Sequence, residues 1–343
     1  MRNALIALLA FAAGVLMVLA VSRPVYEKPR AAPATSVAKP ASPASAAPHD
    51  GDQEEADDDT GASRWPSDGL TPEQVMYAQP QLLRHALSQL GPRVPGKPNL
   101  YVIAFAGDGA EDVFRNEVEY VPKLFASRFG PTAHTLVLEN NPASLDTRPL
   151  ANWSNLETAL ESLAGTMDRN EDILLLYMTT HGDHESNLLV DMDPIPLDQI
   201  GPPDLADIFK KHPFKWKVIV VNACYSGGFV PDMRGEGTLV LTAARKDRSS
   251  FGCGSDSDIT YFGKAWLVNG LNQSADFIAA FNQARSDIAQ WEKDGKLTPS
   301  EPQIDTGPGI VDQLAKWRHS ASVGPGTPFS AAPAPGRAQP GTP

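Results

Sequence analysis

The chain has 343 residues, 42% of them hydrophobic, and a formal net charge of −12 at pH 7. Part of the negative charge falls in one acidic run near the amino terminus, and no basic patch suggests a nucleic-acid partner. Cysteine occurs twice, and no Cys/His cluster has the spacing of a zinc site. We therefore expect no nucleic-acid partner, no metal and no cofactor.

Residues 4–21 carry no charge, and these eighteen residues are long enough for a short transmembrane helix. Val18-Leu19-Ala20 offers a passable small-residue cleavage site, which leaves a cleaved signal peptide as the alternative. We expect residues 1–22 to be an anchor or a signal peptide. An anchor would hold the remaining chain outside the cytoplasm, on the periplasmic side of an inner membrane, whereas cleavage would release a secreted protein.

Two other segments lack the apolar side chains of a folded core. Residues 23–66 are rich in Ala and Pro and then acidic, a composition that predicts an extended, disordered linker. Residues 320–343 are rich in Pro, Gly and Ala, and we expect them to be a disordered tail. The interval 67–319 remains, and about 250 residues are enough for one domain with a full core.

Within this interval, strand-like and helix-like patterns alternate along the chain. Buried-strand runs begin at 99, 133, 173, 218 and 238, and helical periodicity occupies 71–90, 113–129, 155–167, 205–211, 265–271 and 277–291. Strands separated by helices need crossover connections, which give a mainly parallel sheet covered on both faces. The predicted fold class is α/β, a three-layer α/β/α sandwich with a mainly parallel central sheet.

Two of the strand runs end on side chains that can take part in catalysis. The run from 173 ends on His181 and Gly182, and the run from 218 ends on Cys224, which Tyr225 and a Ser-Gly-Gly segment follow. Open α/β sheets build their sites at the carboxyl ends of their strands, so the two side chains are expected to meet there. A thiol attacks as thiolate, and a neighbouring imidazole can take its proton. The pair therefore predicts a cysteine nucleophile with His181 as its general base.

The backbone beside these residues is suited to the same chemistry. The N–H groups of Gly182 and Cys224 are candidate donors to a developing oxyanion. Each residue also has a purely structural interpretation, because a histidine at a strand end is often only hydrogen-bonded and a buried cysteine is usually inert. Cys224 and Cys253 could also form a disulfide in an oxidising compartment. His184 is a second candidate base, although no strand holds it in place.

Several segments resemble the legumain-like cysteine peptidases, a family that includes the catalytic subunit of glycosylphosphatidylinositol transamidase and is related to caspases. They are the two strand ends, Phe105-Ala106-Gly107 with Phe114-Arg115, the Thr-Ala-Ala to Ser-Ser-Phe-Gly-Cys segment at 242–253, and Tyr-Phe-Gly-Lys-Ala-Trp at 261–266. The similarity covers 99–266. It implies a caspase-like sandwich for the domain at 67–319 and a polypeptide as the substrate.

The resemblance also implies roles for individual residues. It implies a dyad of His181 and Cys224 and an oxyanion hole that includes the amides of Gly182 and Cys224. Asp108 lies where the family places an Asn that orients the histidine, so the same role is expected of it. The residues expected to line the pocket for the side chain preceding the scissile bond are Arg115, Ser249 and Ser250.

The sequence departs from the family in that pocket. Legumains bind Asn with one Arg and with acidic groups that accept from the amide nitrogen. Here Tyr225 stands in place of a Glu, and Lys264 stands in place of an Asp. The donors remain and the expected acceptors are gone, so we predict a preference for an acidic side chain, Asp first. If Tyr225 and Lys264 point away from the pocket, the specificity would instead be broad.

Three functions remain open at this point. The first is a membrane-tethered cysteine endopeptidase that hydrolyses its substrate. The second is a transamidase, because an amine in place of water can resolve the same acyl-enzyme. The third is a catalytically silent binding module on a stalk, which a disulfide between Cys224 and Cys253 would favour.

Overall fold

The structure, a computed structural model, describes residues 65–333. These residues belong to one compact unit, Asp59–Pro343. The expected anchor or signal peptide at 1–22 and nearly all of the expected linker at 23–66 lie outside the described residues. Within residues 65–333, no helix has both the length and the apolar character needed to cross a membrane.

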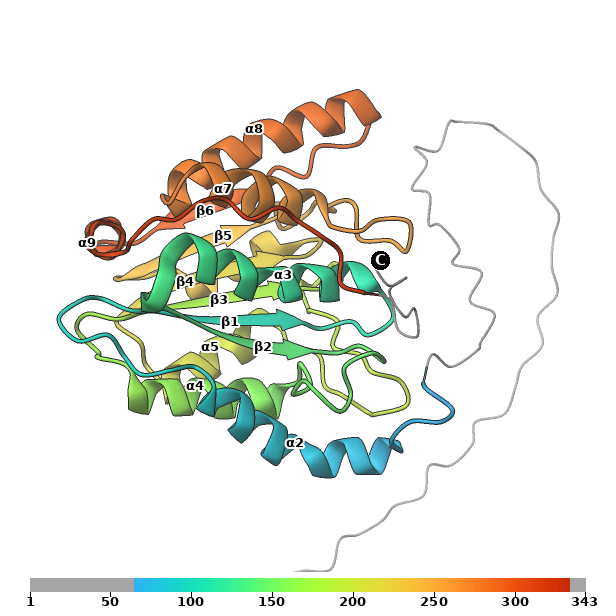
Figure 1. The fold of residues 1–343 in the computed structure, drawn as a ribbon. Helices are drawn as coiled ribbons and strands as arrows, with labels where there is room; N and C mark the ends of the chain where they lie inside the picture. The colour runs from blue at the N-terminus through green and yellow to red at the C-terminus, as the bar shows by residue number, and fades with distance from the viewer. Residues whose placement is uncertain (1–64, 334–343) are drawn as a thin grey trace, which may run out of the picture. The chain divides into compact units, whose positions relative to one another are not determined.

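A six-stranded sheet with strand order β2-β1-β3-β4-β5-β6 forms the centre of this unit (Figure 1). Its strands are β1 (Leu100–Ala106), β2 (Ala133–Glu139), β3 (Ile173–Thr179), β4 (Trp216–Asn222), β5 (Thr238–Thr242) and β6 (Gln303–Thr306). The first five strands are parallel, and β6 runs antiparallel to β5. Because β2 and β3 lie on opposite sides of β1, the chain changes direction across the sheet at β1 and β3, where such sheets bind ligands.

Helices cover both faces of the sheet, as Figure 1 shows. One face packs against α3 (Asp112–Phe129), the π-helix η3 (Gly263–Gly270), α7 (Leu271–Gln273), α8 (Phe277–Gly295) and α9 (Ile310–Ser320). The other packs against α2 (Pro72–Ser88), α4 (Trp153–Thr166), α5 (Pro202–Lys211) and α6 (Val230–Met233). The predicted α/β class and three-layer arrangement are confirmed.

The continuous apolar runs of the strands follow from this arrangement. Successive side chains of a strand point to opposite faces. In β1, Leu100, Val102 and Ala104 pack toward α3, whereas Tyr101 and Ile103 pack toward α4, and all five are buried. A strand covered on both faces therefore needs apolar residues at every position, which is why these runs were recognisable in the sequence.

Several elements, including the short helix α6, differ from the prediction. No strand was predicted at β6, which has four residues, none of them buried, and lies at the edge of the sheet. Helix α9 was not predicted either. The helix expected at 265–271 is a π-helix that begins at Gly263 and continues into α7. A short polar edge strand carries little of the hydrophobic pattern on which such a prediction depends.

Residues 321–333 also differ from expectation. We expected 320–343 to be a disordered tail, but residues 321–333 lie along α3 in an extended conformation (Figure 1). The remaining residues of the expected tail, 334–343, lie outside the described part of the chain.

Hydrogen bonds tie this C-terminal segment, residues 321–333, to α3 at both ends of the helix. Gly324 N donates to Arg128 O at 2.8 Å near the end of α3, and Arg115 Nη1 donates to Pro333 O at 3.0 Å near its beginning. Between them, the Tyr120 hydroxyl donates to Thr327 O at 2.7 Å, and Ala332 N donates to Asn116 Oδ1 at 2.9 Å. The segment therefore runs antiparallel to the helix along its whole length.

Candidate active site

His181 lies two residues beyond the end of β3, at the carboxyl edge of the sheet. The preceding residue, Thr180, donates from its N–H to Asn222 O at the end of β4 at 3.2 Å, which joins the two strand ends. The imidazole meets the Phe114 ring edge-on, with centroids 5.1 Å apart. With its side chain 37% exposed, His181 is accessible to a substrate while one side of its ring is fixed by packing.

Asp108 lies beside the same imidazole, as the resemblance implied. Its Oδ2 is 3.6 Å from His181 Nε2, and the carboxylate is almost fully buried. Its Oδ1 accepts from Ala110 N at 2.8 Å, in the turn that follows β1. A distance of 3.6 Å is too long for a good hydrogen bond, but it places the carboxylate next to the ring nitrogen.

Cys224 lies two residues beyond the end of β4, the strand next to β3. Its Sγ accepts a hydrogen bond from Ser250 N at 3.2 Å, and Ser250 O and Oγ lie 3.6 and 3.7 Å away. Ser250, which the resemblance implied as a pocket residue, therefore contacts the sulfur of the expected nucleophile directly. A backbone N–H that points at sulfur stabilises the thiolate relative to the thiol.

The surroundings of Cys224 favour its reactive form. Its pKa is lowered to about 6, chiefly by a hydrogen bond from the Cys253 side chain. Burial opposes this shift, whereas hydrogen bonds from Ser250 and the charge of His181 add to it. The pKa of Cys253 is raised correspondingly, since its proton stabilises the neighbouring thiolate. Both cysteines are free thiols, so the disulfide considered from the sequence is not formed in the structure.

Gly182 and Cys224 bring their backbones unusually close. A Cβ added at Gly182 would overlap the carbonyl oxygen of Cys224, so only glycine permits this approach. Within residues 65–333, neither the Gly182 N–H nor the Cys224 N–H has a hydrogen-bond acceptor. Two donors without acceptors at adjacent strand ends are what an oxyanion hole requires.

Tyr225, the residue after the nucleophile, has a left-handed backbone with φ 55° and ψ 12°. This conformation costs a non-glycine residue about 1–3 kcal/mol and is found preferentially at functional sites. Hydrogen bonds from Tyr225 N to Arg248 O and from Ser186 Oγ to Tyr225 O, both 2.8 Å, hold it in place. The Tyr225 hydroxyl lies 3.3 Å from Nε2 of His184, the second candidate base. The described contact of His184 is therefore with Tyr225.

The remaining residues implied for the pocket lie in different environments. Ser249 Oγ donates to the Tyr225 hydroxyl at 3.4 Å. Lys264 lies on η3, and its Nζ is 5.1 Å from the centre of the Trp291 ring on α8. The described contacts of Lys264 therefore face α8 and include none of the residues around Cys224.

Arg115 lies on the first turn of α3, one residue after Phe114. Its Nε is 3.5 Å from Glu139 Oε1 at the end of β2, and its Nη1 donates to Pro333 O of the C-terminal segment. Burial raises the pKa of Glu139 to about 7, and the charge of Glu119 adds to the shift. At neutral pH, therefore, the carboxyl that faces Arg115 is only partly ionised, and the charge of Arg115 is only partly balanced.

Sequence reasoning missed two residues that shape this site. Cys253 was considered only as a disulfide partner, and its position three residues after Ser250 was the available signal that it lies near Cys224. Glu139 carried no signal, because it only ends an ordinary strand run. Its contact with Arg115 follows from the packing of α3 on β2, which the sequence pattern does not fix.

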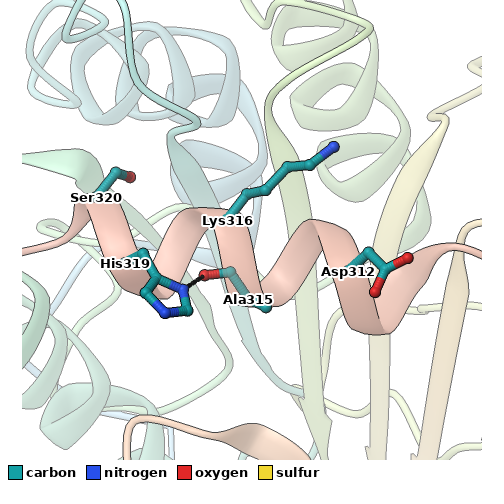
Figure 2. Close-up of a pocket in the computed structure, with 5 residues that line it drawn as sticks. All are labelled: Asp312, Ala315, Lys316, His319 and Ser320. Carbon is teal, nitrogen blue, oxygen red and sulfur yellow. Dashed lines mark hydrogen bonds between the residues drawn. The ribbon is translucent and has the colours of Figure 1, made fainter.

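A hollow lies along the exposed side of α9, and Figure 2 shows the residues that line it. It is lined by Asp312, Ala315, Lys316, His319 and Ser320, and the His319 ring Nδ1 lies 2.6 Å from Ala315 O of the same helix. All of these residues belong to one helix, so no second element encloses a ligand there. Among residues 65–333, no group of three or more His, Cys, Asp or Glu side chains is arranged to hold a metal.

Comparison with known proteins identifies the segment that contains both strand ends. Residues 156–306 match the model of the Peptidase C13 family, and this match includes His181, Cys224 and the Ser249–Ser250 pair. Among solved structures, the chain is similar to caspase-1 from Spodoptera frugiperda at 13% identity and a TM-score of 0.42, over 63% of this chain and 89% of that one. No curated protein matches the sequence.

The match and the site agree on the chemistry. Peptidases of this kind act on polypeptides, and the matched segment supplies a cysteine and a histidine at neighbouring strand ends. Residues 156–306 thus resemble the Peptidase C13 family, and the protein is a cysteine-type peptidase.

Proposed function

We propose that this peptidase is an endopeptidase that cuts its substrate through a thioester on Cys224, with His181 as general base and then general acid. One observation carries the proposal. A thiol with a pKa of about 6 and two backbone N–H groups without acceptors among residues 65–333 lie at the ends of adjacent parallel strands. Nucleophile and oxyanion donors are the parts that acyl transfer needs.

In the proposed reaction, the Cys224 thiolate attacks the carbonyl carbon of the scissile bond. The carbonyl oxygen takes up the negative charge, and the N–H groups of Gly182 and Cys224 stabilise it, each by about 3–4 kcal/mol. His181 gives its proton to the leaving amine and later takes one from the water that hydrolyses the thioester. Asp108, 3.6 Å from the ring, stabilises the imidazolium.

A peptide-cleavage assay on the full chain in mild reductant tests this proposal. Cleavage by the wild type and its loss in Cys224→Ala and His181→Ala are the expected results. His184→Ala is the matched control, since the described contact of His184 is with the Tyr225 hydroxyl, and this variant should keep most of the activity. A wild type that cuts no peptide, or a Cys224→Ala variant that cuts as well, would reject the proposal. Adding an amine acceptor separates hydrolysis from transamidation, because a dominant amide product would identify a transamidase.

We further propose that the pocket prefers an acidic side chain before the scissile bond. Arg115 supplies the positive charge, and Glu139 balances that charge only when it is ionised. Because the pKa of Glu139 is about 7, the preference should be strongest below that pH and should weaken above it. Arg115→Gln should abolish it.

The test compares kcat/KM for matched Asp and Asn peptides at about pH 6 and about pH 8. Ionisation of Cys224 affects both substrates equally and cancels in the ratio. Asn peptides cut about tenfold better than Asp peptides at both pH values would contradict the preference. If the ratio of kcat/KM for Asp and Asn peptides does not change with pH, the ionisation of Glu139 has no influence on the preference, and Arg115 alone is its source.

We also propose that residues 1–22 remain as an uncleaved anchor that holds the peptidase outside the cytoplasm. The eighteen uncharged residues at 4–21 support an anchor. Fractionation of cells that express the full chain, with protease added from outside, tests this placement. A soluble secreted product whose amino terminus begins after residue 20 would instead identify a cleaved signal peptide.

A further inference from the structure

A group of buried polar side chains lies directly beneath the two strand ends. We call it the Glu117 cluster, and its members are Glu117, Tyr177, Thr179, Asn222 and Thr260. Their exposed fractions lie between 0% and 3%, so the cluster does not touch substrate. A buried carboxylate is costly unless it is hydrogen-bonded, and its presence so near a catalytic site needs an explanation.

The Glu117 carboxylate is surrounded by donors. Its Oε1 accepts from Thr260 N at 2.9 Å and from Thr260 Oγ1 at 2.6 Å. Its Oε2 accepts from the Tyr177 hydroxyl at 2.5 Å and from Asn222 Nδ2 at 2.9 Å. Gly263 N donates to Thr260 Oγ1 at 2.9 Å, which leaves the hydroxyl proton of Thr260 for Glu117. Four donors around one carboxyl group favour its ionised form, since that form accepts at every oxygen.

Two opposing effects act on the pKa of Glu117. Burial raises the pKa above its usual range, and the hydrogen bonds from Thr260 and Tyr177 offset only part of that rise. An added Cβ at Gly263 would overlap the carboxylate, so the backbone of η3 also packs directly against it. The carboxylate is therefore held between its hydrogen-bond donors and the backbone at Gly263.

Each donor belongs to a segment that supplies part of the active site. Asn222 ends β4 two residues before Cys224, and its carbonyl accepts from the residue before His181. Tyr177 lies on β3, which leads to His181. Thr260 lies in the segment between β5 and η3, and Ser250 of the same segment donates to the sulfur. Glu117 itself lies on α3, the helix whose Phe114 packs on the imidazole.

We propose that Glu117 is a positioning residue whose buried carboxylate sets the spacing of the Cys224 sulfur, the His181 ring and the Ser250 N–H. It makes no contact with the reacting atoms and acts through Asn222, Thr260 and Tyr177. The inference rests on the proposed function only where kcat and KM for peptide cleavage are used to test it. The alkylation rate of Cys224 reports the same spacing without any turnover.

The experiment replaces the carboxylate with its neutral isostere in the full-length protein. For Glu117→Gln, kcat should fall about 10- to 100-fold with KM little changed, as expected when reacting groups move by about 1 Å. Alkylation of Cys224 by iodoacetamide, followed by mass spectrometry, should have its pH midpoint raised. Glu292→Gln is the matched control, because Glu292 of α8 is also buried and accepts from Ser300 N at 3.0 Å, and neither residue belongs to the Glu117 cluster. Glu292→Gln should lower thermal stability and leave kcat and the alkylation midpoint of Cys224 unchanged.

A second pair of variants separates positioning from folding. The double variant Glu117→Gln with Asn222→Asp returns one carboxylate to the cluster, opposite an amide donor, and should restore part of kcat and of the alkylation midpoint. If Glu117→Gln does not fold, Tyr177→Phe removes one donor to Oε2 and should lower kcat by a smaller factor in a folded protein. A folded Glu117→Gln with unchanged kcat and alkylation overturns the proposal, as does an unchanged folded Tyr177→Phe. A wild type that cuts no peptide, but whose alkylation responds to these changes, would reject the peptidase function and keep the positioning role.

Discussion

Cys253 affects the active site as a hydrogen-bond donor, although cysteines near a nucleophile are usually considered for disulfide bonding. Its hydrogen bond is the largest cause of the lowered pKa of Cys224, ahead of the contribution of His181. In the proposed reaction, the neighbouring thiol and the imidazole both stabilise the thiolate.

Replacing this donor should raise the pKa of Cys224. In the wild type, alkylation of Cys224 should rise with pH around 6, because the thiolate is the reactive form. In Cys253→Ala the same rise should occur at a higher pH, and in Cys253→Ser, which keeps a donor, the shift should be smaller. Iodoacetamide rates between about pH 5 and about pH 9, with Cys224 identified by mass spectrometry, measure the midpoint. Identical midpoints in the three proteins would show that the Cys253 proton does not stabilise the thiolate.

At the scale of elements, the site depends on the distance between the two chain segments that follow β3 and β4. These segments lie beyond the last hydrogen bonds that pair the two strands. The ends of β3 and β4 are joined by the bond from Thr180 N to Asn222 O. One step further along each strand, Gly182 lies against the Cys224 carbonyl. The N–H groups proposed as oxyanion donors belong to these two residues, so strand spacing and catalysis are coupled.

A methyl group at Gly182 should therefore impair catalysis more than it impairs folding. Gly182→Ala must push the Cys224 backbone away, and loss of one aligned oxyanion donor typically lowers kcat about 100- to 1,000-fold. Gly165→Ala is the matched control, because Gly165 lies near the end of α4 with no neighbouring atom in the way. That substitution should raise stability by about 0.5–1 kcal/mol and leave kcat unchanged. Equal activity in both variants, measured beside thermal melts, would exclude a role for the strand spacing.

The elements that the sequence predicts well are those that are buried on two sides. The strands that carry His181 and Cys224 are apolar throughout, so both their existence and the side chains at their ends were readable. The sheet order then brought Asp108 to the same edge, as the family resemblance implied. Helix α2 was recognisable for a local reason, since Thr71 caps it and both halves of the capping box are present.

Contacts between distant elements were not readable in the same way. Glu117 lies within an amphipathic helix, where a glutamate is ordinarily expected to face solvent, yet it is completely buried. Its burial depends on donors from β3, β4 and the Thr260 turn, which no local pattern reveals. The contact of Arg115 with Glu139 and the contact of Cys253 with Cys224 have the same origin.

At the scale of the whole unit, helix α3 is covered on two sides, by the sheet and by the C-terminal segment. One side packs on the sheet, and the C-terminal segment lies along another side of the helix. The Tyr120 ring meets Phe329 of this segment edge-on, with centroids 5.4 Å apart. Because α3 carries Phe114, Arg115 and Glu117, anything that loosens this cover acts near the active site.

Removing the aromatic contact should release the C-terminal segment without unfolding the domain. Phe329→Ala loses a half-buried ring and should cost about 1 kcal/mol. Limited proteolysis should then cut within residues 321–333 faster than in the wild type, with little change in melting temperature. Val323→Ala serves as the control, since Val323 is 47% exposed. Equal cutting rates in the two variants would show that Phe329 does not hold the segment.

The same cover has a consequence for the order of events during synthesis. Arg128 bonds to a residue 196 positions later in the chain, and Arg115 bonds to one 218 positions later. When α3 leaves the ribosome, the residues that will cover it have not yet been made, and neither have β4 and β5. Contacts of such long sequence separation form late and slow folding. A nascent chain that pauses before residue 321 would therefore expose the helix that organises the nucleophile, and the peptidase would acquire its final geometry only after that point.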